Sequence, residues 1–160
     1  MTKITVYCEV DLVSKKLKDV SYELISKAHK LALEATNIKN DTSFEIEALA
    51  LSDTLDKESI QKALSAGANK LTLIKENCLG IFSQTIFSQC FVEYYKKNPS
   101  EIIIFPATPK GRIVAPRITT ILNAGLVADC TELSFIVKNN ELYFAPTRPT
   151  FGSELMATII

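Results

Sequence analysis

The sequence predicts an α/β domain in which helices cover both faces of a mostly parallel, twisted sheet, with a C-terminal β-hairpin attached. Strand-like and helical segments alternate four times with short connections, and this alternation is typical of right-handed crossovers between parallel strands. The strand-like runs "ITV", "LTLI" and "IIIF" have no polar face, as expected for strands that are covered on both sides. After Gly125 the helical period disappears.

The first half of the chain supplies two strands and two helices. Residues 3–10 and 44–52 are rich in β-branched and apolar residues and are interpreted as strands. Residues 19–37 carry apolar side chains at helical spacing, with Asp19 or Ser21 as the candidate N-cap. Residues 56–68 form a shorter helix, which Gly67 closes as a C-terminal cap.

The second half repeats the pattern. Residues 69–76 and 101–107 are predicted strands, and residues 81–98 a helix that ends in two lysines before Pro99. A fourth helix ends at Gly125 and is expected to start near residues 111–113, because Pro116 is tolerated only in a first turn. Residues 133–146 form a hairpin with two asparagines at its turn, and residues 154–160 look like one more strand.

Length and composition restrict the possible functions. A chain of 160 residues forms one domain, and 18 basic against 18 acidic residues give no net attraction to nucleic acid. We expect no membrane insertion, because no apolar run approaches the length of a transmembrane helix, and the start does not resemble a signal peptide. Four scattered cysteines and one histidine argue against zinc and disulfides, so a cytoplasmic protein is predicted.

Catalytic motifs are missing from the sequence. No nucleophile elbow, zinc-protease motif, dinucleotide fingerprint or Walker A loop occurs, and His29 lies in the middle of a predicted helix. The acidic residues Asp53, Asp56 and Glu58 stand near a helix start, where the helix dipole favours them. We therefore predict no catalytic residue and no metal ligand.

The segment "PATPKGRIVAPRI", residues 106–118, lies between a predicted central strand and a helix. Thr108 to Gly111 form the turn, and the free amides of the helix start together with Lys110 and Arg112 could bind an anion. Ordinary capping with two solvated cations explains the same residues, and both interpretations stay open.

A second unusual segment, "APTRPTFGS", covers residues 145–153. Its two prolines and its glycine predict a stiff structural corner between strands. Arg148 is the residue there that could also contact a carboxylate, a phosphate or a partner surface.

Taken in order, these segments resemble the N-terminal domain of the electron-transfer flavoprotein alpha subunit. The resemblance spans nearly the whole chain, begins with a first strand that ends in Glu9, and includes "AGANKLTLI". Two positions depart from the family pattern, since Ile113 replaces an acid and Ser153 replaces a glycine. The other matching residues are Gly111, Arg112, Pro116, Arg117, Leu126, Asp129, Arg148, Pro149, Phe151 and Gly152.

The resemblance implies an adenine-nucleotide-hydrolase-like fold and a heterodimer with a beta subunit. The complete alpha subunit would accept electrons from dehydrogenases and pass them on through FAD. Most FAD contacts would come from a C-terminal domain absent from residues 1–160, so this chain alone is expected to bind FAD weakly or not at all. The resemblance implies contacts to a partner or neighbouring domain through Arg112, Arg117 and Arg148, whereas Thr108, Gly111 and Arg112 are weaker candidates for cofactor binding.

Two other interpretations concern this loop and the loop after the first strand. A stand-alone adenine-nucleotide-binding module similar to universal stress proteins would hold phosphates there, although such proteins usually have more glycines than "TPKGR". An enzyme of the ATP-pyrophosphatase type needs a glycine-rich loop after the first strand, and "YCEVDLVSKK" contains no glycine.

Overall fold

The computed structural model of the chain describes residues 1–150 and 155–160. Its central element is a parallel sheet with the strand order β5-β4-β1-β6, in which β4 pairs with β1 and β5, and β1 pairs with β6. These strands are β1 (Thr2–Cys8), β4 (Phe44–Ser52), β5 (Lys70–Lys75) and β6 (Ile102–Ile104). The predicted parallel sheet is confirmed.

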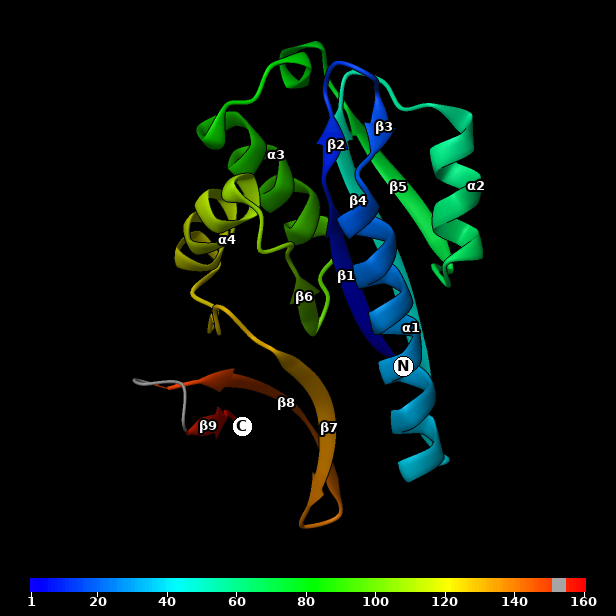
Figure 1. The fold of residues 1–160 in the computed structure, drawn as a ribbon, viewed down its shortest axis with the longest axis vertical. Helices are drawn as coiled ribbons and strands as arrows, with labels where there is room; N and C mark the ends of the chain where they lie inside the picture. Colours follow the sequence, from blue (N-terminus) through cyan, green and yellow to red (C-terminus); the bar gives the residue numbers. More distant parts are fainter. Residues whose placement is uncertain (151–154) are drawn as a thin grey trace.

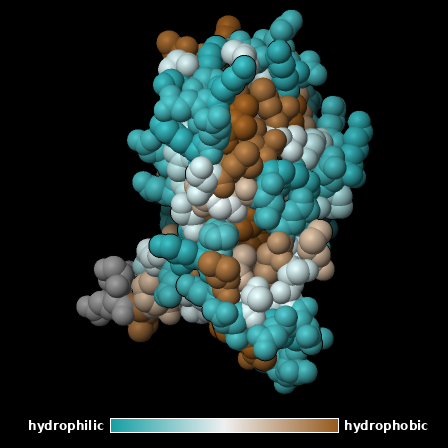
Figure 2. All heavy atoms as spheres, turned by 90° about the vertical axis from the view of Figure 1, so that its right-hand side faces the viewer, coloured by the Kyte–Doolittle hydropathy of each residue, from teal (hydrophilic) through white to brown (hydrophobic). Residues whose placement is uncertain are grey.

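Helices cover both faces of this sheet, which confirms the three-layer prediction (Figure 1). One face packs against α1 (Asp19–Ile38) and α2 (Lys57–Ser65), and the other against α3 (Gln84–Lys97) and α4 (Pro109–Leu122). Alternate residues of β1 separate the two hydrophobic cores, since Val6 and Cys8 face the α1 side and Tyr7 faces α3 and α4. Seen from its β5 edge, the molecule shows a hydrophobic stripe between hydrophilic surfaces (Figure 2).

A three-stranded antiparallel sheet follows the α/β unit. It consists of β7 (Glu132–Lys138), β8 (Glu141–Pro149) and β9 (Met156–Thr158), in that order. The ring centroid of Phe135 of β7 lies 5.4 Å from that of Phe44 and 5.6 Å from that of Phe144. These contacts attach the antiparallel sheet to the hydrophobic core on the α1 side of the parallel sheet. Asn139 and Asn140 have φ values of 53° and 63°, so the predicted asparagine turn is confirmed.

Several short elements escaped sequence prediction. The chain forms a small hairpin from β2 (Val10–Asp11) and β3 (Lys16–Leu17), and a 3-10 turn, η1 (Asn77–Gly80), before α3. The hairpin contains Lys15 in the left-handed conformation, with φ 59°, where the sequence has no glycine to signal a turn. The corner residues Phe151, Gly152 and Ser153 lie outside the described residues.

The ends of the first three helices differ in part from the predictions. Neither Asp19 nor Ser21 caps α1, whose N-cap is Lys18; the Ser21 side chain binds the backbone of Glu9 instead. Gly67 closes α2 as predicted: its φ is 114°, and its N–H and that of Ala68 bond back to Leu64 and Ala63. The third helix starts three residues later than predicted, after the Ser83 N-cap.

Both predicted ends of α4 were wrong. The helix begins at Pro109, after the N-cap Thr108, and it ends before Asn123, which adopts the left-handed conformation with φ 52°. Pro116 therefore lies inside the helix, where it removes the N–H that would bond to the carbonyl of Arg112. Pro116 is on the exposed side of α4, so water can reach that carbonyl in place of the lost donor.

Candidate functional site

The loop between β6 and α4 contains the residues that the sequence singles out. Thr108, the N-cap of α4, accepts a hydrogen bond from the backbone N–H of Gly111 at 3.1 Å. The same hydroxyl donates to Oε2 of Glu9, which follows β1. Both hydrogen-bonding functions of Thr108 are therefore used within the chain.

Glu9 is the buried acid of this site, with only 3% of its surface exposed. Its Oε1 forms an ion pair with Nζ of Lys18 at 2.5 Å, and its backbone N–H donates to Oγ of Ser21 at 2.9 Å. Because Lys18 and Thr108 are the N-caps of α1 and α4, the Glu9 carboxylate links the starts of two helices. Glu9 ends the first strand in the sequence resemblance, but no local pattern marks it as part of a site.

Gly111 shapes the same loop by its lack of a side chain. A Cβ atom at this position would overlap the backbone carbonyl oxygen of Pro106, which cannot move without shifting the loop. Gly111 is buried in the first turn of α4, so the loop can fold back over the helix start only with glycine here.

The two cations of the loop have partners on the surface. Nζ of Lys110 lies 5.2 Å from the ring centroid of Phe82. Nη2 of Arg112 contacts Oδ1 of Asp129 at 2.6 Å, and its Nε donates to the carbonyl of Ala107 at 3.2 Å. The Arg112–Asp129 ion pair ties the first turn of α4 to the connection that leads into β7.

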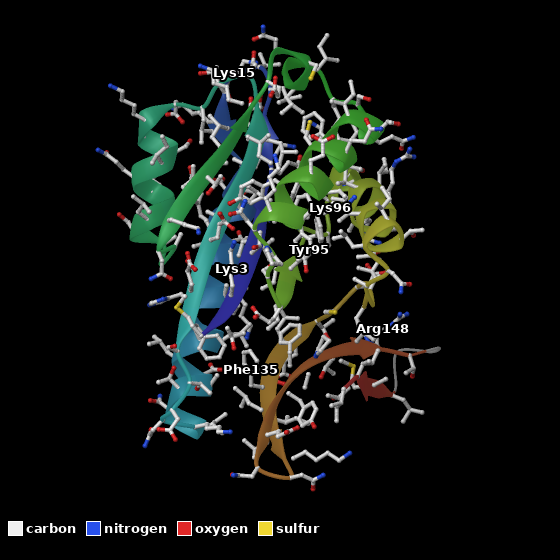
Figure 3. All side chains as sticks on the ribbon, turned by 180° about the vertical axis from the view of Figure 1, so that it is seen from behind. Lys3, Lys15, Tyr95, Lys96, Phe135 and Arg148 are labelled. Atoms are coloured by element: carbon white, nitrogen blue, oxygen red, sulfur yellow. The ribbon has the colours of Figure 1, made fainter. Side chains whose placement is uncertain are left out.

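The other predicted contact residues lie on two separate elements. Arg117 is exposed on α4, where Ile113 and Ile121 are also exposed one turn before and after it. Arg148 is exposed on β8, opposite Ala157 of β9 (Figure 3). The structure thus brings Thr108, Gly111 and Arg112 together in one loop and places Arg117 and Arg148 on surfaces outside it.

A second polar cluster, not predicted from the sequence, lies between the sheet and α3. Glu47 of β4 is completely buried and accepts hydrogen bonds from the Tyr94 hydroxyl and, at 2.7 Å, from Thr72. Nζ of Lys3 forms an ion pair with it at 2.7 Å, and that of Lys70 lies 3.7 Å away. An acid within the apolar run "FEIEALALS" was the available signal.

Burial and hydrogen bonding act in opposite directions on the Glu47 carboxyl. Burial raises its pKa, but the hydrogen bonds from Lys3, Tyr94 and Thr72 outweigh burial and hold the pKa below its ordinary value. Burial and the same bond to Glu47 raise the pKa of Tyr94. The cluster is a satisfied ionic network in the core, with its charges paired.

Two classes of site have no counterpart in the described part of the chain. No three histidine, cysteine, aspartate or glutamate side chains of residues 1–150 and 155–160 gather as a metal ion would require. None of the helices in these ranges combines the length and the apolar character that are needed to cross a bilayer.

The sequence of the chain is similar to those of several known proteins. The chain is 34% identical to the electron transfer flavoprotein subunit alpha of Clostridium acetobutylicum over 145 residues, which are 91% of this chain and 40% of that protein. It is 30% identical over 157 residues, 98% of the chain, to the lactate dehydrogenase (NAD(+),ferredoxin) subunit LctC of Acetobacterium woodii, of which it covers 34%. Protein FixB of Azorhizobium caulinodans is 30% identical over 142 residues, 88% of this chain and 36% of that protein.

The chain thus spans about two fifths of the length of the curated alpha subunits that it matches. The family model for the electron transfer flavoprotein domain matches residues 7–160, from the end of β1 through the antiparallel sheet. This range includes the loop of Thr108 and the Arg112–Asp129 pair. The resemblance noted from the sequence is confirmed, and the chain belongs to the electron transfer flavoprotein domain family.

Proposed function

We propose that this chain acts as the N-terminal domain of an electron-transfer flavoprotein alpha subunit, in a complex that passes electrons from dehydrogenases through FAD. The observation that carries this proposal is the family match over residues 7–160, together with relatives that are named alpha subunits and are far longer than this chain. The domain serves mainly as a scaffold and as a subunit interface. The flavin carries the redox chemistry, and no side chain of this domain is catalytic.

The loop geometry supports a scaffold role better than a flavin-binding role. Thr108 is engaged by Glu9 and Gly111, and Arg112 by Asp129 and Ala107, so the groups suited to a diphosphate already have partners. We therefore propose that FAD is held by protein outside residues 1–160. The assignment of Thr108, Gly111 and Arg112 to cofactor binding stays a prediction, which the flavin assay below tests.

The solvent face of α4 is our candidate for contact with a beta subunit. Ile113 and Ile121 are exposed on either side of Arg117, which combines apolar surface with a guanidinium group suited to partner carboxylates. Arg148 on β8 and Arg112 at the start of α4 are the other proposed contact residues.

Co-expression with a beta-type subunit tests the interface. The tagged chain should retain that subunit on an affinity column, and Arg117→Ala and Arg148→Ala should each weaken retention. Lys57→Ala is the matched control, since Lys57 is an exposed cation on α2, on the opposite face of the sheet. If the wild-type chain fails to retain the beta-type subunit, the interface proposal is wrong.

A flavin assay tests the scaffold role. The purified chain should be colourless and should bind added FAD weakly or not at all, whereas a yellow chain with stoichiometric flavin would contradict the proposal. Binding of labelled ATP by the chain, together with loss of that binding in Arg112→Ala, would instead favour the stand-alone nucleotide-binding module.

A further inference from the structure

The direction in which successive strands are added to the sheet reverses between β1 and β6. From β1 the chain crosses to β4 and then β5 on one side, and it returns to β6 on the other side of β1. In open α/β sheets, ligands bind beyond the carboxyl ends of the two strands at such a switch point. The residues after β1 and β6 are therefore where an anionic ligand would be expected.

The structure places a carboxylate of the chain itself at this point. Glu9 comes directly after β1, and its side chain reaches Thr108, which comes shortly after β6. Its other carboxylate oxygen lies 2.5 Å from Nζ of Lys18. The partners of the carboxylate are the Thr108 hydroxyl, which donates to it, and the Lys18 ammonium group, which forms an ion pair with it. Both stand at the N-termini of helices that lie on opposite faces of the sheet (Figure 1). Helix starts of this kind bind phosphates in other folds.

The backbone of Glu9 is fixed by hydrogen bonds of its own. The N–H of Glu9 donates to Oγ of Ser21 at 2.9 Å, and the carbonyl of Glu9 accepts from the N–H of Lys18 at 2.9 Å. With only 3% of the residue exposed, the side chain cannot turn to solvent without losing its contacts to Thr108 and Lys18.

We infer that Glu9 is a built-in anionic ligand, which occupies the switch point of the sheet and excludes phosphate groups from it. A phosphate would meet a buried negative charge, and the hydroxyl and ammonium groups that could bind it are already engaged. Removal of the carboxylate leaves these groups without their acceptor and converts the same position into a small-anion site. The inference concerns contacts within the chain and does not depend on any partner subunit or flavin.

Anion rescue of Glu9→Ala tests the inference. The variant should have a lower thermal midpoint than the wild type, and sodium formate or inorganic phosphate should restore part of the loss. A site that binds one anion lowers the unfolding equilibrium constant about tenfold when the free anion is at ten times its dissociation constant. The wild type in the same salts reports the general effect of salt, which is subtracted.

Two further variants separate this site from a general gain of stability. Glu9→Gln keeps the shape of the side chain without its charge, so it fills the position and should show no rescue beyond the wild type. Thr108→Val in the Glu9→Ala background removes the hydroxyl donor and should reduce the rescue at least severalfold. If Glu9→Ala does not fold in buffer, its refolding yield in formate is compared with the yield in sodium chloride of equal ionic strength.

Rescue in Glu9→Ala alone, and weaker rescue after Thr108→Val, supports the inference. It is overturned if Glu9→Ala responds to formate and phosphate no more than the wild type, or refolds equally in chloride. Binding of phosphate or AMP at this position by the wild-type chain, seen by calorimetry and lost in Thr108→Val, would also overturn it.

Discussion

The backbone carbonyl oxygen of Pro106 occupies the space that a Cβ atom on residue 111 would need. Gly111→Ala should therefore destabilise the chain by about 1–3 kcal/mol, because the loop before α4 must shift to relieve the overlap. Urea denaturation followed by circular dichroism measures the change. Gly125→Ala is the control, since a Cβ there meets nothing within 4 Å, and its effect should stay within about 0.5 kcal/mol. Equal effects of the two variants would contradict the structure of this loop.

The ion pair of Lys3 with Glu47 should contribute strongly to stability. Lys3→Met removes the nearer cation of the completely buried Glu47 and leaves only Lys70 at 3.7 Å, so it should lower the free energy of unfolding by about 3 kcal/mol. Lys62→Met removes a cation from the exposed pair with Glu58 and should change the free energy of unfolding little. A small effect of Lys3→Met in urea denaturation would show that other groups of the cluster satisfy Glu47.

The same carboxylate should make stability depend on pH. Since the pKa of Glu47 is lowered in the folded chain, its contribution is complete above the ordinary glutamate pKa of about 4.3 and is lost as pH falls toward the lowered value. Glu47→Gln should therefore show a shallower loss of unfolding free energy on acidification below that pH than the wild type. Parallel pH profiles for the two proteins would exclude this contribution.

The four thiols should differ sharply in their reactivity. Burial raises the pKa of Cys8 to about 12, which leaves on the order of a thousandfold less thiolate than an ordinary cysteine has. Cys78 is exposed, so iodoacetamide should modify it first and Cys8 last. Mass spectrometry of timed samples maps the order, and all four sites should react at similar rates in denaturing urea. Early modification of Cys8 in the folded chain would disagree with its burial.

The asparagine turn between β7 and β8 offers a gain in stability. Both asparagines have positive φ, and glycine adopts this conformation without the cost that a Cβ brings. Asn140→Gly should therefore raise the thermal midpoint, whereas Asn140→Val should lower stability by about 1–2 kcal/mol. Nζ of Lys39 donates to the backbone carbonyl of Asn140 and not to its side chain, so both variants keep the acceptor of this bond.

Local signals predicted the fold well. The alternation of apolar strands and amphipathic helices predicts the parallel sheet and its layers, and single residues such as Gly67 and Asn139 mark turns through their backbone conformation alone. Pro116 misled the prediction of the α4 start, because the rule that keeps proline out of a helix interior ignores that water can reach the freed carbonyl on an exposed side. Lys15 takes the left-handed conformation without any glycine signal, so the small hairpin was missed.

The candidate site was less accessible to prediction, because its contacts are distant in sequence. Glu9 and Thr108 are 99 residues apart, and only the strand order brings the ends of β1 and β6 together. The two charges of the Lys3–Glu47 pair lie on neighbouring strands, whose register no local pattern specifies. Arg112 was identified as a loop cation, but its pairing with Asp129 depends on how the connection after α4 folds back.

The order of the strands also has a consequence for how the chain folds during synthesis. β1 can pair with β4 once about fifty residues have emerged, and the helix between them makes this a local crossover. The other edge of β1 stays unpaired until Ile102–Ile104 is made, because β6 is the partner of β1 on that side. An apolar strand with one unpaired edge is prone to association with other chains. The central strand of the nascent chain is thus the first to be made and remains open on one side until most of the domain has been synthesised.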